Sequence, residues 1–176
     1  MLVECRPLND QICPEPYYCQ LLSQMMTYKR TTTFDPYFKA LVIDLDKDLW
    51  ARYPDIQQNF APFNFVDDSF RVILAQEDEA PVGCGCFRPM KEKDVVEIKR
   101  MYVAPIFRSK GVGKVILKKL EQWAMEEGFV LAKLETGINQ PEAIAAYEKS
   151  GYVPIPNFEP YIGVKESICM MKRLTK

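Results

Sequence analysis

A short turn, RSKGVGK at residues 108–114, has the residue types and the glycine spacing that a phosphate site needs. Gly111 and Gly113 stand at alternate positions, so the backbone can come close to a ligand and direct several N–H groups toward it. We expect a helix to begin directly after them, and the N-terminus of a helix favours an anion. The predicted pyrophosphate site consists of Arg108, Ser109, Lys110, Gly111, Val112, Gly113 and Lys114.

Two other phosphate-binding patterns do not fit this turn. A P-loop needs four residues between its glycines, whereas only Val112 separates Gly111 from Gly113. A dinucleotide-binding fingerprint needs a further glycine where Ile116 stands. For the turn taken alone, a plain strand-to-helix connection with solvated lysines remains the alternative.

The surroundings of the turn resemble a known family. The pattern R-x-x-G-x-G follows a strand-like segment that ends at Met101-Tyr102-Val103, and in this setting it resembles the acyl-CoA pyrophosphate motif of the GNAT superfamily of N-acetyltransferases. A second segment, NQPEAIAAYEKSGY at residues 139–152, resembles the later N-x-x-A-x-x-x-Y-x-x-x-G-[FY] block of that family. The resemblance covers the chain from about residue 25 to its C-terminus, and the motifs closely resemble those of a group of small bacterial acetyltransferases.

The resemblance implies a fold and a ligand. The fold is α/β (α+β), with a mixed, mostly antiparallel sheet of six to seven strands, helices on both faces, and strands four and five splayed apart to admit acetyl-CoA. Backbone groups freed by the split would pair with the pantetheine amides. Gln140 matches the position of the family's cofactor-binding Asn, while Asn139 stands one place earlier, so both remain candidates. The acetyl-CoA contacts implied beyond the turn are Met101, Tyr102, Val103, Asn139, Gln140, Ala143 and Tyr147.

Glu97 and Tyr147 are the candidates for proton transfer. The chain has no histidine, and Glu97 occupies the strand position at which some relatives carry a glutamate general base. Tyr147 matches the family tyrosine that protonates or hydrogen-bonds the CoA thiolate, and a phenol with a reference pKa of about 10 can donate a proton at neutral pH. The alternatives are a Glu97 that is ion-paired beside Lys99 or Arg100, and a tyrosine that only packs at the edge of its helix.

We expect the acyl acceptor to be a primary amine of a small molecule, either amino-acid-like or polyamine-like. Arginine side chains could pair with a substrate carboxylate, and a glutamate could attract an ammonium group. The residues expected to contact the acceptor are Arg52, Tyr53, Arg100, Glu135 and Tyr161. Two alternatives stay open: a noncatalytic acyl-CoA-binding regulatory module, and an N-acetyltransferase that acts on proteins or peptides.

Composition indicates one ordinary domain. Of the 176 residues, 48% are hydrophobic, and the net charge of −1 gives no electrostatic case for a nucleic acid or an anionic membrane as partner. No apolar run approaches the roughly 20 residues of a membrane helix. The six cysteines show neither a disulfide-framework spacing nor a C-x-x-C pair, so we expect reduced thiols and no metal site. Because the N-terminus also lacks the basic start and apolar stretch of a signal peptide, we expect a cytoplasmic protein. The resemblance adds a homodimer as a possible assembly.

Periodicity and turn signals predict the elements that position these residues. Residues 1–24 show no clear hydrophobic period, and we expect them to be an N-terminal extension of a domain that covers residues 25–176. The alternative is that the first strand lies at Leu2–Arg6. We expect residues 51–69 to form an ordered loop or a short helix. The expected strands are Met26–Thr31, Phe70–Gln76, Val82–Pro89, Val95–Val103, Phe129–Thr136, Tyr152–Ile155 and Ser167–Arg173. The expected helices run from Asp35-Pro36 to about Trp50, from the glycine turn to Gly128, and from Pro141 to Gly151.

Overall fold

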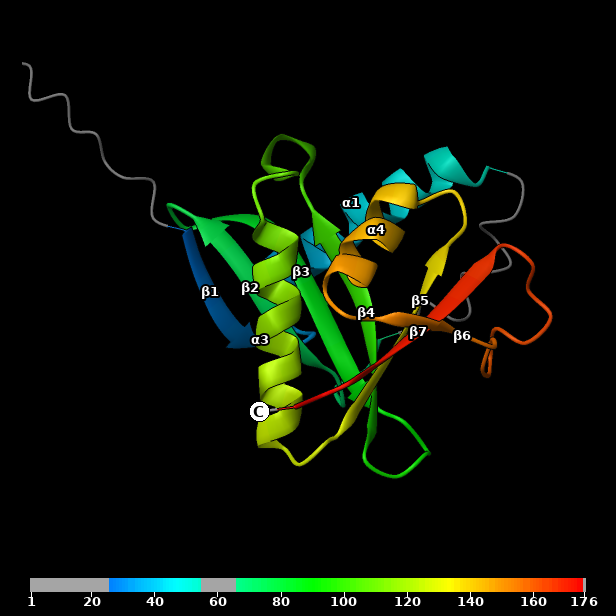
Figure 1. Ribbon diagram of the computed structural model, residues 1–176. Coiled ribbons are helices and arrows are strands. Elements are labelled where there is room, and N and C mark those ends of the chain that lie inside the picture. Colours follow the sequence, from blue (N-terminus) through cyan, green and yellow to red (C-terminus); the bar gives the residue numbers. More distant parts are fainter. Residues whose placement is uncertain (1–25, 55–65, 176) are drawn as a thin grey trace, which may run out of the picture.

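Seven strands form one sheet in the computed structural model, which describes residues 26–54 and 66–175 (Figure 1). The strands are β1 (Met26–Thr31), β2 (Arg71–Glu77), β3 (Ala80–Pro89), β4 (Val95–Val103), β5 (Leu131–Gly137), β6 (Val153–Ile155) and β7 (Ser167–Arg173). Their order in the sheet is β1-β2-β3-β4-β5-β7-β6. Neighbouring strands are antiparallel except β4 and β5, which are parallel. The mixed, mostly antiparallel sheet predicted from the sequence is confirmed.

Helices cover both faces of the sheet. They are α1 (Pro36–Arg52), the short 3-10 helix η2 (Pro105–Phe107), α3 (Val112–Glu126) and α4 (Pro141–Lys149). Figure 1 shows α3 and α4 in front of the sheet and α1 behind it. The expected helices and strands are all found, and their ends differ from the predicted ends by at most two residues, as Leu131 against Phe129 illustrates.

The helix α1 begins where Asp35 and Pro36 predict it. The Asp35 carboxylate accepts a hydrogen bond of 2.9 Å from the N–H of Tyr37, and Pro36 occupies the first turn, where a missing N–H costs nothing. Its buried side chains are Phe38, Leu41 and Leu45. They pack against one face of the central strands and form one part of the core.

The second part of the core lies on the opposite face, under α3. The helix contributes Ile116, Leu117 and Leu120, which lie on one side of it as the sequence periodicity predicts. Strand β2 serves both parts, because Val72 faces α1 and Ile73 faces α3. The middle of the sheet is therefore buried on both of its faces.

Cys84 and Cys86 lie on the same face of β3, as their spacing predicts, and both are buried and free. Their thiols donate to the backbone carbonyls of Arg100 and Lys99, at 3.5 and 3.4 Å. Burial raises the pKa of Cys84 well above its usual value and that of Cys86 to about 12. Both groups are thus protonated at neutral pH and act as core side chains.

The hairpin between β2 and β3 is tighter than predicted. The predicted strands end at Gln76 and begin again at Val82, whereas the observed strands extend further and leave only Asp78 and Glu79 between them. These two residues have φ angles of 47° and 69°, the positive values that a two-residue hairpin turn requires. The pair Asp-Glu is not a typical signal for such a turn, so the sequence underestimated both strands.

A bulge interrupts β4 at Arg100 and Met101. Cys84 pairs with Tyr102 and Cys86 pairs with Lys99, so one residue of β3 stands opposite two residues of β4. Arg100 has a φ of 56°, a left-handed conformation that is rare for a residue other than glycine. The extra residue reverses the alternation of the strand: Val96 and Ile98 face α3, whereas Tyr102 faces α1.

The bulge lies where β4 separates from β5. The two strands pair from Val95 with Leu131 as far as Ile98 with Leu134, and β4 then continues to Val103 without β5 beside it. The predicted splay of strands four and five is confirmed. It leaves the second half of β4 with one neighbouring strand, β3.

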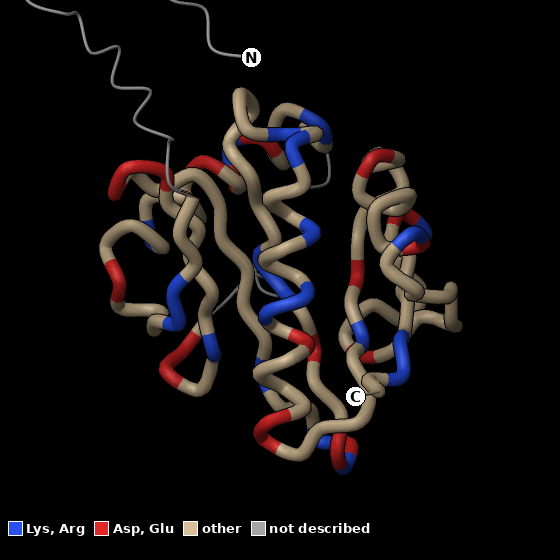
Figure 2. Tube along the Cα trace, turned by 60° about the vertical axis from the view of Figure 1, so that its left-hand side comes forward, with Lys and Arg blue, Asp and Glu red and all other residues tan. Residues whose placement is uncertain are grey.

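Three expectations concern residues that the structure does not describe. The extension of residues 1–24 and the alternative first strand at Leu2–Arg6 both lie outside the described ranges, as does most of the segment predicted to be a loop or short helix at 51–69. Among the described residues, 26–54 and 66–175, no helix has both the length and the apolar character that crossing a bilayer requires. Figure 2 shows basic and acidic residues interspersed over the described elements.

Candidate active site

A cavity of about 120 Å³ lies where β4 and β5 part. The end of α1 contributes to its wall from one face of the sheet and α4 from the other, so the cavity passes through the gap between the strands. The predicted catalytic and acceptor-contacting residues in its wall are Tyr53, Glu97, Arg100, Glu135, Tyr147 and Tyr161. The predicted acetyl-CoA contacts in its wall are Met101, Gln140 and Ala143.

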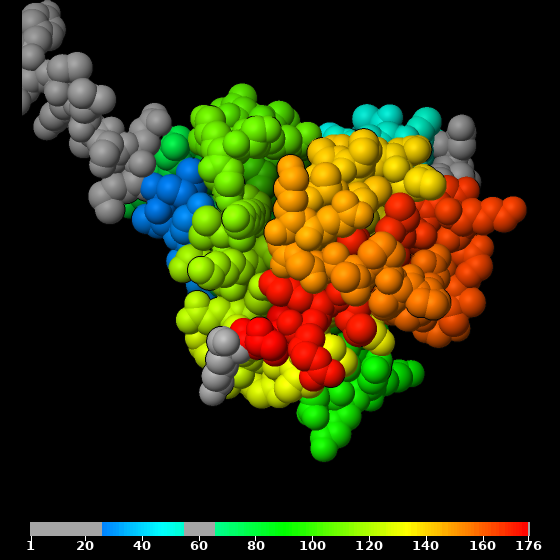
Figure 3. Space-filling model, in the orientation of Figure 1, coloured from blue at the N-terminus to red at the C-terminus, as the bar shows by residue number. Residues whose placement is uncertain are grey.

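The glycine turn lies outside this wall, at the N-terminus of α3 on the face shown in Figure 3. Gly111 is the N-cap residue with a φ of 83°, and Ser109 has a φ of 62°. Regular helical hydrogen bonding begins with the N–H of Val115, which donates to the carbonyl of Gly111. Within the described ranges, the N–H groups of residues 109–114 donate to no protein acceptor. They are therefore available to an anion.

The surroundings of the two glycines fit a bound pyrophosphate. A Cβ built on Gly111 would meet no protein atom within 4 Å, and one on Gly113 would lie 3.5 Å from a methyl group of Val103. The protein itself therefore leaves space beside the free amides. The lysines of the turn, Lys110 and Lys114, are exposed, and Lys110 Nζ lies 5.1 Å from the ring centre of Phe107.

Arg108 is held by the protein rather than left free for a phosphate. Its Nε donates to the carbonyl of Val103 at 2.9 Å, and its Nη2 lies 2.9 Å from Oδ2 of Asp48 on α1. The guanidinium also lies 5.7 Å from the ring centre of Tyr102, which is buried on the α1 face. Arg108 therefore fixes the turn against the end of β4 and against α1.

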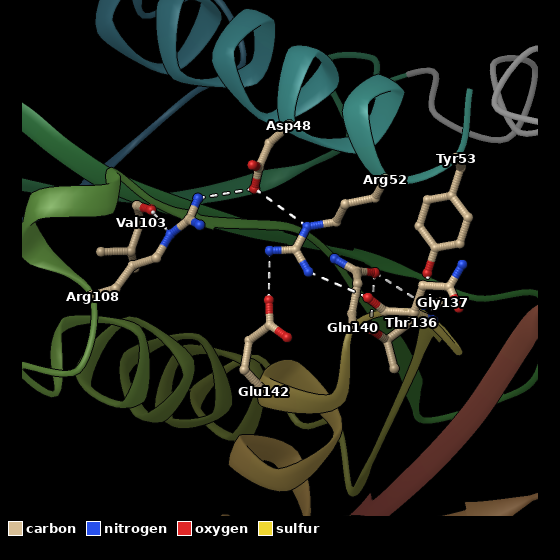
Figure 4. A network of polar contacts seen from close by, with 10 residues as sticks. Asp48, Arg52, Tyr53, Val103, Arg108, Thr136, Gly137, Gln140 and Glu142 are labelled. Atoms are coloured by element: carbon tan, nitrogen blue, oxygen red, sulfur yellow. Dashed lines mark hydrogen bonds and ion pairs between the residues drawn. The ribbon is translucent and has the colours of Figure 1, made fainter.

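Arg52 bridges α1 and α4, as Figure 4 shows. Its Nη2 lies 2.6 Å from Oε1 of Glu142, its Nε lies 3.9 Å from Oδ2 of Asp48, and its Nη1 donates to the carbonyl of Asn139 at 3.3 Å. It does not line the cavity. The predicted role of Arg52 as an acceptor contact is therefore not supported by its position, because its charge already joins the two helices.

Tyr53 and the loop after β5 fit closely together in the same view (Figure 4). The Tyr53 hydroxyl accepts a hydrogen bond of 2.9 Å from the N–H of Asn139. The Gln140 carbonyl oxygen, Oε1, accepts from the N–H of Gly137 at 3.0 Å and from Oγ1 of Thr136 at 3.2 Å. Gln140 lines the cavity and Asn139 does not, so geometry favours Gln140 of the two pantetheine candidates.

Glu97 is buried, with 1% of its surface exposed, and donors surround both of its oxygens. Oε2 accepts from Nε and Nη2 of Arg88 at 2.9 and 2.8 Å. Oε1 accepts from Nζ of Lys99 and from the hydroxyl of Tyr161, both at 3.0 Å. The ion-paired alternative for Glu97 thus describes its geometry, with Arg88 in place of Arg100 as the second cation. Arg100 instead pairs with Asp46, at 2.7 Å.

Tyr147 is partly buried and faces the cavity from α4. Its ring makes an edge contact with Tyr152, at 5.8 Å between centroids. Burial, followed by the charge of Glu135, raises the pKa of Tyr147 above its usual value. Its hydroxyl has no hydrogen-bond partner among the described residues, so a protonated phenol is available to a ligand.

Glu135 and Tyr161 complete the polar wall. Glu135 Oε1 accepts a hydrogen bond of 2.6 Å from the hydroxyl of Ser167, and burial raises the pKa of Glu135. The Tyr161 hydroxyl lies between Glu97 and Nζ of Lys99, the latter at 2.6 Å. The wall therefore holds carboxylates, phenols and an ammonium group, all of which can transfer protons. Among the described residues, no thiol or imidazole lines the cavity.

No sequence pattern indicated Arg88 or Ser167 as part of the site, and Lys99 was expected only as an ion-pair partner of Glu97. Lys99 stands two residues after Glu97, and this spacing on a strand puts both side chains on one face. The pairing of Glu97 with Arg88 depends on the register of β3 against β4, and that of Glu135 with Ser167 depends on β7. Of these contacts, only the spacing of Glu97 and Lys99 was visible in the sequence.

Residues 29–152 match the family model described as Acetyltransferase (GNAT) family. An IAA acetyltransferase of Azospirillum brasilense is 29% identical over 150 residues, which cover 85% of this chain and 98% of that protein.

Among solved structures, a Klebsiella pneumoniae protein described as a candidate acyl-CoA N-acyltransferase is 30% identical, with a TM-score of 0.72 over 86% of this chain and 99% of the other. The PaiA N-acetyltransferase of Thermoplasma acidophilum, solved in complex with coenzyme A, is 14% identical, with a TM-score of 0.64 over 84% of this chain and 99% of the other. At that identity, the likeness concerns the fold alone.

Proposed function

Because the chain belongs to the GNAT acetyltransferase family, we propose that it transfers the acetyl group of acetyl-CoA to a primary amine of a small molecule. The observation that carries the proposal is the cavity in the gap between β4 and β5, which has carboxylates and a free phenol in its wall. An acyl transfer to an amine needs a proton acceptor, a proton donor and an opening for the acyl donor.

On the donor side, the free amides of residues 109–114 would bind the pyrophosphate at the positive end of the α3 dipole. The unpaired edge of β4 after Ile98, together with Gln140 and Ala143, would contact the pantetheine. Acetyl-CoA, when bound, supplies an acetyl group activated as a thioester. Tyr147 would donate a proton to the departing sulfur, and its raised pKa keeps the phenol protonated for that step.

On the acceptor side, the size and charge of the cavity favour a small amine. The cavity, with a volume of about 120 Å³, is a narrow opening between strands, which suits the amine of a small molecule better than a folded protein segment. Both cationic side chains in the wall are paired, Lys99 with Glu97 and Arg100 with Asp46. Polyamine-like and amino-acid-like amines are the acceptors we propose to test.

The test is mass-spectrometric detection of acetylated product after incubation with acetyl-CoA and a panel of amino acids, polyamines, aminoglycosides and peptides. Tyr147→Phe is the control, because it removes the phenol oxygen and keeps the ring. We expect the wild-type protein to form an acetylated product, and we expect the rate of product formation to be at least about 100-fold lower with the variant. Acetyl-CoA binding without any product would instead favour a noncatalytic binding module. Product from peptides alone would favour a protein N-acetyltransferase.

A further inference from the structure

We propose that Glu135, and not Glu97, is the carboxylate that binds the ammonium group of the acceptor and takes its proton. This inference rests on the proposed function. It assigns Glu135 a catalytic role, whereas the sequence suggested only that this residue attracts a cationic amine. Both carboxylates line the same cavity, so their hydrogen-bond partners decide between them.

Glu97 cannot accept a proton without losing existing contacts. Its Oε2 is held by two nitrogens of Arg88, and its Oε1 by Lys99 and Tyr161. Lys99 itself is only 7% exposed, so protonation of Glu97 would leave a buried ammonium group without its counter-charge. A carboxylate in this position stabilises the wall of the cavity and is poorly suited to exchange protons during turnover.

Glu135 has the opposite arrangement. Its Oε1 accepts one hydrogen bond, from Ser167 at 2.6 Å, and no cation of the described residues lies within ion-pair distance of it. No second donor to this carboxylate is found in the described part of the chain, so Oε2 can accept from an ammonium group in the cavity. A partly buried carboxylate without a cation is a site at which a cationic ligand recovers the cost of burial.

The electrostatic surroundings raise the pKa of Glu135 above its usual value, in the direction that makes a carboxylate a stronger base. Burial raises the pKa of Glu135, while the hydrogen bond from Ser167 and the charge of Lys99 lower it in part, and the charge of Glu97 raises it. The other titratable groups that face Glu135 are Tyr53 from α1, Tyr147 from α4, Tyr161 from the segment between β6 and β7, and Cys169 from β7. All of these groups are neutral in their protonated forms, so Lys99 is the cation whose charge lowers the pKa of Glu135.

The proton balance uses both Glu135 and Tyr147. The Glu135 carboxylate takes one proton from the ammonium group, and the freed nitrogen lone pair forms the C–N bond with the acetyl carbon. As the C–S bond breaks, Tyr147 gives its proton to the sulfur and regains one from the nitrogen of the product. Glu135 then releases its proton to solvent, so the ammonium group has lost two protons in total. No oxidant, reductant or metal is needed.

The hydrogen bond from Ser167 makes this inference testable through the pH dependence. Because this bond lowers the pKa of Glu135, Ser167→Ala should raise that pKa further. The acidic limb of kcat/KM should then move to higher pH, since the base must be ionised to act. The substitution removes one buried hydroxyl and leaves the Glu135 side chain itself chemically unchanged.

The experiment measures kcat/KM against pH with the amine of the panel that is acetylated fastest, for wild-type protein, Glu135→Gln, Ser167→Ala and the exposed control Glu148→Gln. In parallel, ¹³C NMR of protein labelled at the glutamate carboxyl carbons follows Glu135 directly, and Glu135→Gln assigns its signal. We expect Glu135→Gln to lower kcat/KM at least about 100-fold and to abolish the acidic limb. Ser167→Ala should shift both the limb and the NMR titration to higher pH, and Glu148→Gln should change neither.

The outcomes separate the two proposals. If Glu135→Gln turns over as fast as the wild-type protein and keeps the acidic limb of kcat/KM, the role of Glu135 is overturned and the acetyltransferase function remains. The role of Glu135 is also overturned if, in Ser167→Ala, the acidic limb of kcat/KM does not shift together with the NMR titration of Glu135. If the wild-type protein acetylates no amine of the panel, the proposed function fails and this inference fails with it.

Discussion

The hydroxyl of Tyr53 lies directly over Gly137: a Cβ built on the glycine would stand 2.0 Å from the phenol oxygen. The residue after α1 and the last residue of β5 are thus in contact across the site. The same hydroxyl accepts the N–H of Asn139, so this contact also fixes the loop that carries Gln140 into the cavity wall. Only glycine permits this approach.

We predict from this contact that Gly137→Ala displaces Tyr53 and breaks its hydrogen bond to Asn139. Overpacking of this kind typically costs about 1–3 kcal/mol of stability. Urea unfolding measures the loss, and Gly137→Ala combined with Tyr53→Phe, which lacks the oxygen, should recover part of it. A single variant with wild-type stability would contradict the close approach.

The proposed pyrophosphate site predicts a charge effect at Gly111. Its φ of 83° is accessible to Asn and Asp, and a side chain there meets no protein atom within 4 Å. Gly111→Asp should therefore weaken acetyl-CoA binding much more than Gly111→Asn, by about tenfold or more. Calorimetry at low and high salt measures both affinities, and the difference should shrink as salt screens the added charge. Equal affinities would exclude this turn as the pyrophosphate site.

The free phenol of Tyr147 predicts separate effects on binding and turnover. Tyr147→Phe should lower kcat at least about 100-fold and leave acetyl-CoA affinity and stability nearly unchanged, because the described residues give the hydroxyl no partner to lose. Steady-state kinetics and calorimetry measure the two quantities. Wild-type kcat in this variant would exclude Tyr147 as the essential acid.

The buried ion pairs of Glu97 predict a loss of stability. Glu97→Gln removes the counter-charge of Lys99, whose side chain is 7% exposed, and breaking a buried pair in this way typically costs about 3 kcal/mol or more. Urea unfolding of Glu97→Gln, Lys99→Met and the double variant forms a double-mutant cycle. We expect the double variant to be more stable than the sum of the single losses implies. Strict additivity would mean that the pair contributes nothing.

The position of β1 predicts the result of a truncation. The strand begins at Met26 and pairs with β2 through Thr31, within the region that resembles the family. Deletion of residues 1–24 should therefore leave a folded protein that binds acetyl-CoA. Circular dichroism and calorimetry test this directly. Collapse of the truncated protein would mean that the first 24 residues contain an essential part of the fold.

The sequence alone determined the elements and the helix N-terminus at which we propose the pyrophosphate site. Helix periodicity, the Asp35-Pro36 start and the alternation of the strands depend on near neighbours in the chain, so β1, β4 and β7 were predicted with their observed bounds. The spacing of Gly111 and Gly113 directly before an amphipathic helix is an equally local signal, and in the structure α3 begins at that point.

Tertiary structure alone decided which acidic and basic groups meet. Arg88 reaches Glu97 through the register of β3, Ser167 reaches Glu135 through β7, and Arg52 reaches Glu142 because α1 ends beside α4. The bulge at Arg100 also left no signal, since a left-handed residue within a strand is usually glycine. These contacts join residues distant in the chain, so their geometry depends on register and packing, which local sequence patterns do not contain.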